Sequence, residues 1–192
     1  IALLIGYPAA YAISRTAPGR QTALLFLAML PFWTNYLIRT YAWIVLLNPA
    51  GLINNLLMGM GLTGEPLPLL YNRFAVVLGL VYVHLLFMVL PLYATIERLD
   101  RSFLEASLDL GASQAQTFVK VTVPLTMPGI VSGIILVFIP CLGSFLTPDL
   151  LGGANALMIG NVIERQFKAA NDWPFGAALS FLLMYATFGA LA

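Results

Sequence analysis

The feature that most constrains this chain is the spacing of its charges, which leaves long uncharged stretches. Residues 74–96, 121–148 and 173–192 contain no Asp, Glu, Lys or Arg. A helix needs about 20 residues to cross the hydrocarbon core of a bilayer. Nine basic and eight acidic residues among 192 fall far below the roughly one quarter of charged residues in soluble domains. The chain is therefore predicted to be a polytopic membrane protein rather than a soluble enzyme.

The apolar stretches are continuous and do not alternate with a period of two, which indicates helices rather than the strands of a membrane barrel. Asp172 precedes Trp173 and Pro174, a pattern typical of a helix start. We therefore predict an all-α fold, a polytopic transmembrane helical bundle. It is expected to be one transmembrane domain, 1–192, truncated at both ends. The expected spans are about 1–14, 21–46, 74–96, 126–147 and 174–192.

The basic residues give a weak indication of orientation. Alternating spans place 15–20 and 97–120 on one side of the membrane with five Lys or Arg residues, against four on the other side. The positive-inside rule then places 97–120 in the cytoplasm. The net charge of +1 gives no indication of a nucleic-acid partner. No group of His, Cys and carboxylate residues has metal-ligand spacing, and no nucleophile–base pair points to a catalytic site.

Residues 97–120 carry seven of the 17 charges and lie between two predicted spans. Ser102 with Glu105, and Ser113 with Gln116, have the spacing of capping boxes at helix starts. Gly111 lies between them, where a helix end favours a residue that tolerates left-handed dihedral angles. The loop is therefore predicted to form two short helices that meet at Gly111.

The first of these helices is predicted to have an apolar side, with Glu105 and Asp109 one turn apart on its polar side. A loop of this kind either binds a partner or lies on the surface of its own membrane. The sequence pattern alone leaves both interpretations open. The predicted apolar side consists of Phe103, Leu104, Leu108 and Leu110.

The loop resembles the EAA signature of permeases from binding-protein-dependent ABC transporters. That signature has E-A-A, then three residues, a glycine, about nine residues and I-x-L-P. Here Glu105-Ala106-Ser107 is followed by Gly111 and by the segment 121–125, Val-Thr-Val-Pro-Leu. Serine replaces the second alanine, and Val-x-Val-Pro replaces I-x-L-P. The spacing and the position between two spans match the signature.

The resemblance implies the core of a type I ABC importer permease with a MetI-like transmembrane domain, which has six spans in the family. It implies a non-catalytic subunit of the inner membrane, and 97–125 would be the cytoplasmic coupling loop. The implied partners are an ATPase dimer, a second homologous permease, a periplasmic or lipid-anchored substrate-binding protein and the lipid bilayer. No cofactor is expected in this chain, because ATP and Mg would be bound by the ATPase. The implied coupling residues are Glu105, Ala106, Ser107, Asp109, Gly111, Ala112 and Pro124.

Segments along the whole chain, among them 31–47 and 138–153, are similar to the spermidine/putrescine-type permease subfamily. This similarity implies polyamine transport. A permease for molybdate, sulfate, iron or thiamine is the alternative within the class, because the EAA loop does not identify the cargo. An ATP-independent transporter or channel would be expected to show acidic residues within its spans or inverted repeats, and neither is evident.

Arg39 lies within an otherwise apolar stretch, and intramembrane charges are rare and often functional. It either contributes to the translocation path or a binding-protein contact, or snorkels to the membrane interface between Tyr36 and Tyr41. The candidates for the path or the binding-protein contact are Trp33, Tyr36, Arg39, Tyr41, Asp149 and Glu164.

Overall fold

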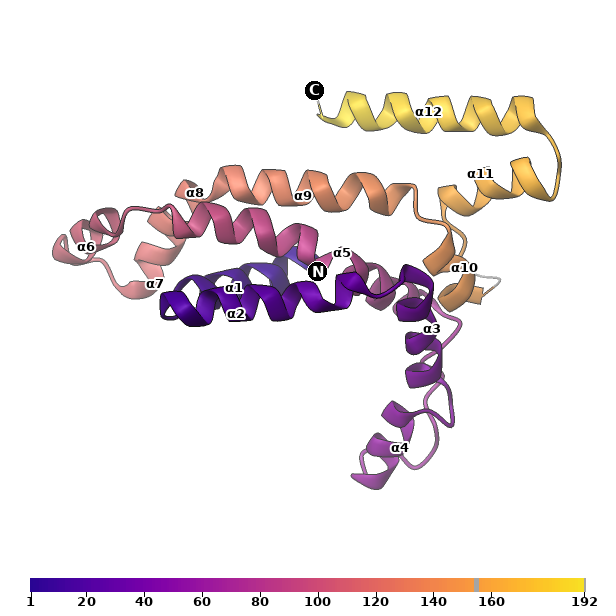
Figure 1. Ribbon diagram of the computed structural model, residues 1–192, viewed down its shortest axis with the longest axis horizontal. Helices are drawn as coiled ribbons and strands as arrows, with labels where there is room; N and C mark the ends of the chain where they lie inside the picture. Colours follow the sequence, from indigo (N-terminus) through magenta and orange to yellow (C-terminus); the bar gives the residue numbers. More distant parts are fainter. Residues whose placement is uncertain (154–155, 192) are drawn as a thin grey trace. The chain divides into compact units, whose positions relative to one another are not determined.

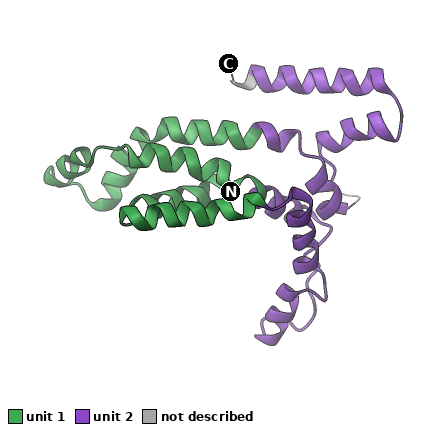
Figure 2. Ribbon diagram, viewed as in Figure 1, with its two compact units in different colours: residues 1–33, 83–138 green, residues 34–82, 139–192 purple. Residues whose placement is uncertain are grey.

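The computed structural model describes residues 1–153 and 156–191, and every regular element within these residues is helical (Figure 1). The predicted all-α fold is confirmed. The chain divides into two compact units, residues 1–33 with 83–138 and residues 34–82 with 139–192 (Figure 2). Two long helices, α5 (Arg73–Glu97) and α9 (Met127–Leu142), contribute residues to both units.

The first unit packs α1 and α2 with the second half of α5 and most of α9. Its core joins Tyr7 and Ala10 of α1 to Leu92 of α5 and Ile130 of α9. The Tyr7 hydroxyl forms a buried hydrogen bond of 2.8 Å with Thr126 Oγ1, which ties α1 to the residue before α9. The elements that lie wholly in this unit are α1 (Ala2–Ser14), α2 (Pro18–Met29), η1 (Leu30–Trp33), α6 (Arg101–Asp109), α7 (Gln114–Thr117), η2 (Phe118–Thr122) and α8 (Val123–Leu125).

The second unit has a core in which Leu47 of α3 and Leu80 of α5 cluster with Leu151 of α10. Gly79 of α5 makes this packing close, because a Cβ there would lie 2.5 Å from Leu151 Cδ1. The other helices of this unit are α3 (Tyr36–Leu47), α4 (Leu52–Gly59), α10 (Leu146–Gly152), α11 (Ile159–Lys168) and α12 (Trp173–Leu191).

Within the described residues, two helical stretches are long and apolar enough to cross a membrane, 36–59 and 73–97. A third is added if 114–125 and 127–142, which meet at a bend of 63°, form one span. Residues 2–14 and 173–189 form shorter apolar helices. Arg73 and Glu97, the charges that border the expected span 74–96, are the first and last residues of α5.

The single helix expected over 21–46 is wrong, because residues 30–35 interrupt it. Pro31 lies in the short 3-10 helix η1, and proline has no amide hydrogen to continue a helical ladder. The Asn35 side chain then accepts a hydrogen bond of 2.8 Å from Leu37 N and begins α3 as its N-cap. Asparagine is a preferred N-cap residue, so this break is encoded locally.

The helix expected over 126–147 is also shorter than predicted. It ends at Leu142, and a turn at residues 143–145 precedes α10. Asn161, which is 1% exposed, donates to the carbonyl oxygen of Phe145 at 2.7 Å. This bond fixes the turn against α11. The predicted start of the last helix is confirmed, since Asp172 accepts a hydrogen bond from Phe175 N at 3.1 Å in front of α12.

Candidate functional site

The polar loop between α5 and α9 lies at one end of the first unit (Figures 1 and 2), and α6 begins it. The Asp100 carboxylate accepts a hydrogen bond of 2.9 Å from Ser102 N. This bond lowers the pKa of Asp100, because it stabilises the charged form. The predicted capping box of Ser102 and Glu105 is therefore wrong. Asp100 caps α6 in its place, which moves Ser102 and Glu105 into the helix.

Gly111 forms the turn between α6 and α7 with a φ of +84°, as the sequence predicted. Two backbone hydrogen bonds close the turn, from Gly111 N to Leu108 O at 2.9 Å and from Ala112 N to Ser107 O at 3.2 Å. This pair of bonds is the Schellman motif, which satisfies the free carbonyls at a helix end. The turn sets the direction in which the chain leaves α6.

The helix α7 begins with the predicted capping box, which is confirmed. Ser113 Oγ accepts from Gln116 N at 3.2 Å, and the Gln116 side chain accepts from Ser113 N at 2.9 Å. The chain then runs through the π-helix η2 into α8, where Pro124 occupies the first turn. Pro124 is exposed, and the 63° bend before α9 follows it.

Side-chain contacts anchor the loop to the rest of the first unit. The hydroxyl groups of Ser107 and Thr117 lie 3.0 Å apart and join α6 to the end of α7. The Phe118 ring packs edge-on against Tyr7 and Tyr11 of α1, with centroids 5.6 and 5.5 Å apart. Because Phe118 follows α7 directly, these ring contacts join the end of the loop to α1.

The helix α6 presents two apolar faces rather than the single apolar side expected. Leu104 is half-buried and lines, with Leu108, a cavity beside α7. Phe103 and Leu110 are 55% and 89% exposed and lie on the opposite side, with Ala106 between them at helical spacing. The prediction failed because neighbouring residues such as Phe103 and Leu104 point about 100° apart around a helix, and Leu108 is itself 44% exposed.

The acidic face of α6 is exposed to solvent. Glu105 and Asp109 lie one turn apart and are both exposed. Ala106 is exposed as well, whereas Ser107 and Ala112 are half-buried against the loop's own backbone and side chains. The other exposed residues from 101 to 110 are Arg101, Ser102, Phe103, Leu108 and Leu110.

In the second unit, Tyr36 and Arg39 of α3 lie close together. The Arg39 guanidinium carbon lies 6.0 Å from the centroid of the Tyr36 ring. The Tyr36 hydroxyl forms a hydrogen bond with Thr147 Oγ1 of α10, and Thr147 is fully buried. The structure thus brings two of the predicted path residues together and adds a third residue, Thr147, to which no sequence pattern pointed.

The other predicted path residues are placed differently. Trp33 belongs to the first unit, is 73% exposed and packs edge-on against Phe26. Tyr41 is 53% exposed on α3, and Asp149 is exposed on α10. The described contacts do not gather these three side chains into one site.

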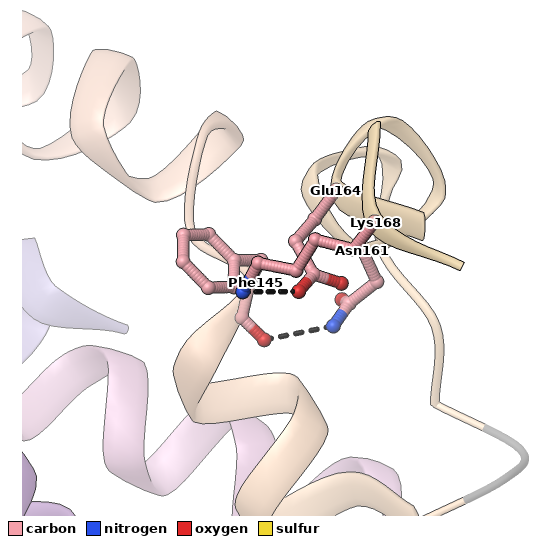
Figure 3. Close-up of polar contacts among 4 residues, drawn as sticks. All are labelled: Phe145, Asn161, Glu164 and Lys168. Atoms are coloured by element: carbon pink, nitrogen blue, oxygen red, sulfur yellow. Dashed lines mark hydrogen bonds and ion pairs between the residues drawn. The ribbon is translucent and has the colours of Figure 1, made fainter. Parts of the chain in front are cut away.

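Glu164 of α11 forms an ion pair of 2.8 Å with Lys168, one turn further on (Figure 3). Lys168 Nζ also lies 5.8 Å from the centre of the Phe145 ring. The hydrogen bond to Glu164 raises the pKa of Lys168, and the negative charge of Asp149 adds a smaller effect in the same direction. The Glu164 carboxylate is therefore paired with a lysine of its own helix, α11.

The fold and the anchored polar loop define a helical membrane protein whose spans are joined by a structured helix–turn–helix. Residues 22–192 match the family described as "Binding-protein-dependent transport system inner membrane component". The chain belongs to this family.

Similar proteins come from several bacteria. The chain is 51% identical over 180 residues to the spermidine/putrescine transport system permease protein PotB of Haemophilus influenzae, covering 94% of this chain and 63% of that protein. It is 48% identical to PotB of Escherichia coli K12, covering 94% of this chain and 66% of that protein. The chain thus spans somewhat less than two thirds of the length of these curated relatives.

A solved structure shares the fold. A bacterial alginate ABC transporter, crystallised in complex with an alginate pentasaccharide-bound periplasmic protein, has a chain with a TM-score of 0.77 to this one. The two are 20% identical, and the match covers 97% of this chain and 69% of that chain. A second alginate transporter structure gives a TM-score of 0.71. At this level of identity the similarity establishes the fold and not the cargo.

Proposed function

We propose that this chain is part of a permease subunit of an ATP-driven importer for polyamines and forms half of its translocation path. The proposal is carried by the structured loop 97–125 in a chain that belongs to the transport family. Relatives that are 48–51% identical to the chain are named spermidine/putrescine transport permeases. The cargo assignment rests on those relatives, because the alginate transporters share the fold. The protein resides in the inner membrane in this proposal.

The proposed coupling element is the loop 97–125. Glu105 supplies an acidic contact to a basic group of a partner ATPase, and Ala106 permits close approach. Gly111 sets the angle between α6 and α7, and the Phe118 ring passes the movement to α1. The ATPase binds ATP and Mg, so this chain catalyses no reaction. Closure of the ATPase dimer would move the two permeases together into an outward-facing state, as in alternating access.

The same proposal includes the partners that this mechanism needs. They are an ATPase dimer, a second homologous permease and a periplasmic or lipid-anchored substrate-binding protein.

Arg39 and Tyr36, held near α10, are proposed to contribute to the path or to the contact with the binding protein. Arg39→Ala should lower uptake while the complex still assembles. Normal uptake by this variant would leave Arg39 with a snorkelling role only.

Uptake of labelled putrescine and spermidine tests the cargo and the coupling separately. The full-length protein and its partner subunits are expressed in a strain that lacks polyamine import. Glu105→Gln should reduce uptake about tenfold, because a charge-assisted hydrogen bond contributes roughly 1.5–3 kcal/mol. Glu65→Gln, an exposed carboxylate far along the chain from the loop, is the matched control. Uptake of sulfate or molybdate in place of polyamines would refute the cargo, whereas full uptake by Glu105→Gln would refute the coupling role.

A further inference from the structure

Two buried threonines stand at the bend between α8 and α9 in the first unit. Thr122 is the last residue of η2 and is 1% exposed, whereas Thr126 lies between α8 and α9 and is fully buried. The helix axis turns by 63° at Thr126. A buried hydroxyl group is costly unless it forms hydrogen bonds, and the proposed coupling role assigns no part to either residue.

The Thr126 hydroxyl is bonded on two sides. Its Oγ1 lies 2.9 and 3.1 Å from the carbonyl oxygens of Thr122 and Val123 and donates its hydrogen to them, a back-bond of the kind that often bends helices. A hydroxyl has one hydrogen to donate, so the Tyr7 hydroxyl is the donor in the 2.8 Å bond to Thr126 Oγ1. A side chain of α1 therefore completes the hydrogen bonding of the bend.

The backbone around Thr126 has fewer helical hydrogen bonds than a regular helix. Pro124 and Pro128 lie on either side of Thr126 and have no amide hydrogen to donate. The preceding element, η2, is a π-helix, and prolines and π-helical turns are common causes of sharp bends in helices. The side-chain hydrogen bonds of Thr126 therefore contribute a larger share of the stability of this bend than they would in a straight helix.

The segments on both sides of the bend are fixed by packing. On α9, a Cβ added at Gly133 would lie 2.7 Å from Met88 Sδ, so α9 packs closely against α5. Before the bend, the Phe118 ring contacts the Tyr7 ring at a centroid distance of 5.6 Å. Tyr7 therefore holds the chain before the bend with its ring and the bend itself with its hydroxyl.

We propose that the bend at Thr126 is a hinge between the loop 97–125 and α9, and that the Tyr7 hydroxyl is the latch that holds the hinge bent. This hinge regulates the proposed coupling element and so rests on the proposed function, in which a partner ATPase moves the loop. When the latch opens, the loop turns about Thr126 while α9 stays packed against α5. One neutral hydrogen bond changes such an equilibrium about three- to tenfold, so the latch biases the hinge and does not lock it.

Distances between two spin labels in the assembled full-length transporter, held in lipid nanodiscs, test the hinge. The labels are attached at exposed positions of α7 and α9, Ala115→Cys and Leu136→Cys, in a background without other cysteines, which in this chain requires Cys141→Ala. A second distance should become populated when a non-hydrolysable ATP analogue is added. Without nucleotide, Tyr7→Phe should raise the ratio of the second distance to the first about three- to tenfold, because it removes the latch and keeps the ring.

Matched variants separate the latch from general packing. Thr126→Val removes the hydroxyl and should also populate the second distance, whereas Thr126→Ser keeps the hydroxyl and should not. Tyr11→Phe is the control for Tyr7→Phe, because Tyr11 packs on the same Phe118 ring at 5.5 Å but its hydroxyl is bonded to Arg15. It should leave the distances unchanged.

Two results would overturn the proposal. Equal effects of Tyr7→Phe and Tyr11→Phe, or no effect of Tyr7→Phe, would exclude the latch, and one unchanged distance in every variant with and without nucleotide would exclude the hinge. The measurement without nucleotide involves neither cargo nor ATP hydrolysis. A latch effect combined with full uptake by Glu105→Gln would therefore refute the coupling role alone, whereas no latch effect combined with impaired uptake by Glu105→Gln would refute the latch alone.

Discussion

Replacing Gly111 tests whether the turn between α6 and α7 controls the loop. Its φ is +84°, and a Cβ added there would meet no atom within 4 Å. A substitution therefore introduces no clash, and its effect comes from the backbone conformation alone. A side chain in the left-handed region costs roughly 1–2 kcal/mol, and a β-branched residue is still less tolerated. Asparagine adopts this conformation more readily.

The expected order of loop stability is therefore glycine, asparagine, alanine and valine at position 111. A change of 1–2 kcal/mol alters a local opening equilibrium by a factor of about 5–30. Hydrogen exchange of the peptide 107–117 in the assembled transporter measures this opening through the two bonds of the turn, and labelled polyamine uptake should fall in the same order. Gly111→Val should impair uptake more than Glu105→Ala, since it disturbs the whole loop rather than one contact.

Gly19→Val is the control for this series. Gly19 also has open space around a Cβ, but its φ lies outside the left-handed region. The substitution should leave exchange of the peptide 107–117 unchanged. If Gly111→Val and Gly111→Asn exchange at the same rate as the unmodified loop, backbone strain at the turn does not determine loop stability, and the reasoning is refuted.

Three further predictions concern the same unit. Gly129→Val should lower the free energy of unfolding by about 1–3 kcal/mol in a denaturation assay, because a Cβ there would overlap Thr95 Oγ1; unchanged stability would contradict this close packing. The hydrogen bond from Ser102 N lowers the pKa of Asp100, so its stabilising effect is present above the unfolded pKa and is lost as the pH falls through the folded one. The protection of the α6 amides, relative to their intrinsic exchange rate at each pH, should therefore fall on acidification, and Asp100→Asn should abolish that pH dependence of protection. Gln116→Cys, in a Cys141→Ala background, should react with an impermeant thiol reagent only when the cytoplasmic face is accessible; labelling of intact cells would reverse the predicted orientation.

Elements with local causes could be predicted from the sequence alone. The Gly111 turn, the capping box of Ser113 and Gln116 and the helix start at Asp172 all depend on residues within five positions of one another. Long uncharged stretches likewise indicated the helices α5 and α12, because hydropathy is a property of the segment itself. The start of α6 was also local, but the sequence pattern predicted Ser102 as the cap, whereas Asp100 two residues earlier caps the helix.

Which residues meet across the chain depends on the tertiary structure. The hydrogen bonds of Tyr7 with Thr126 and of Tyr36 with Thr147 join residues more than 100 positions apart. No periodicity encodes such pairs, because each depends on how whole helices pack. The burial of α6 side chains was decided in the same way, since Leu104 is half-buried whereas Phe103 on the same helix is 55% exposed. Local patterns identify the helices and turns, whereas packing selects which side chains form a site.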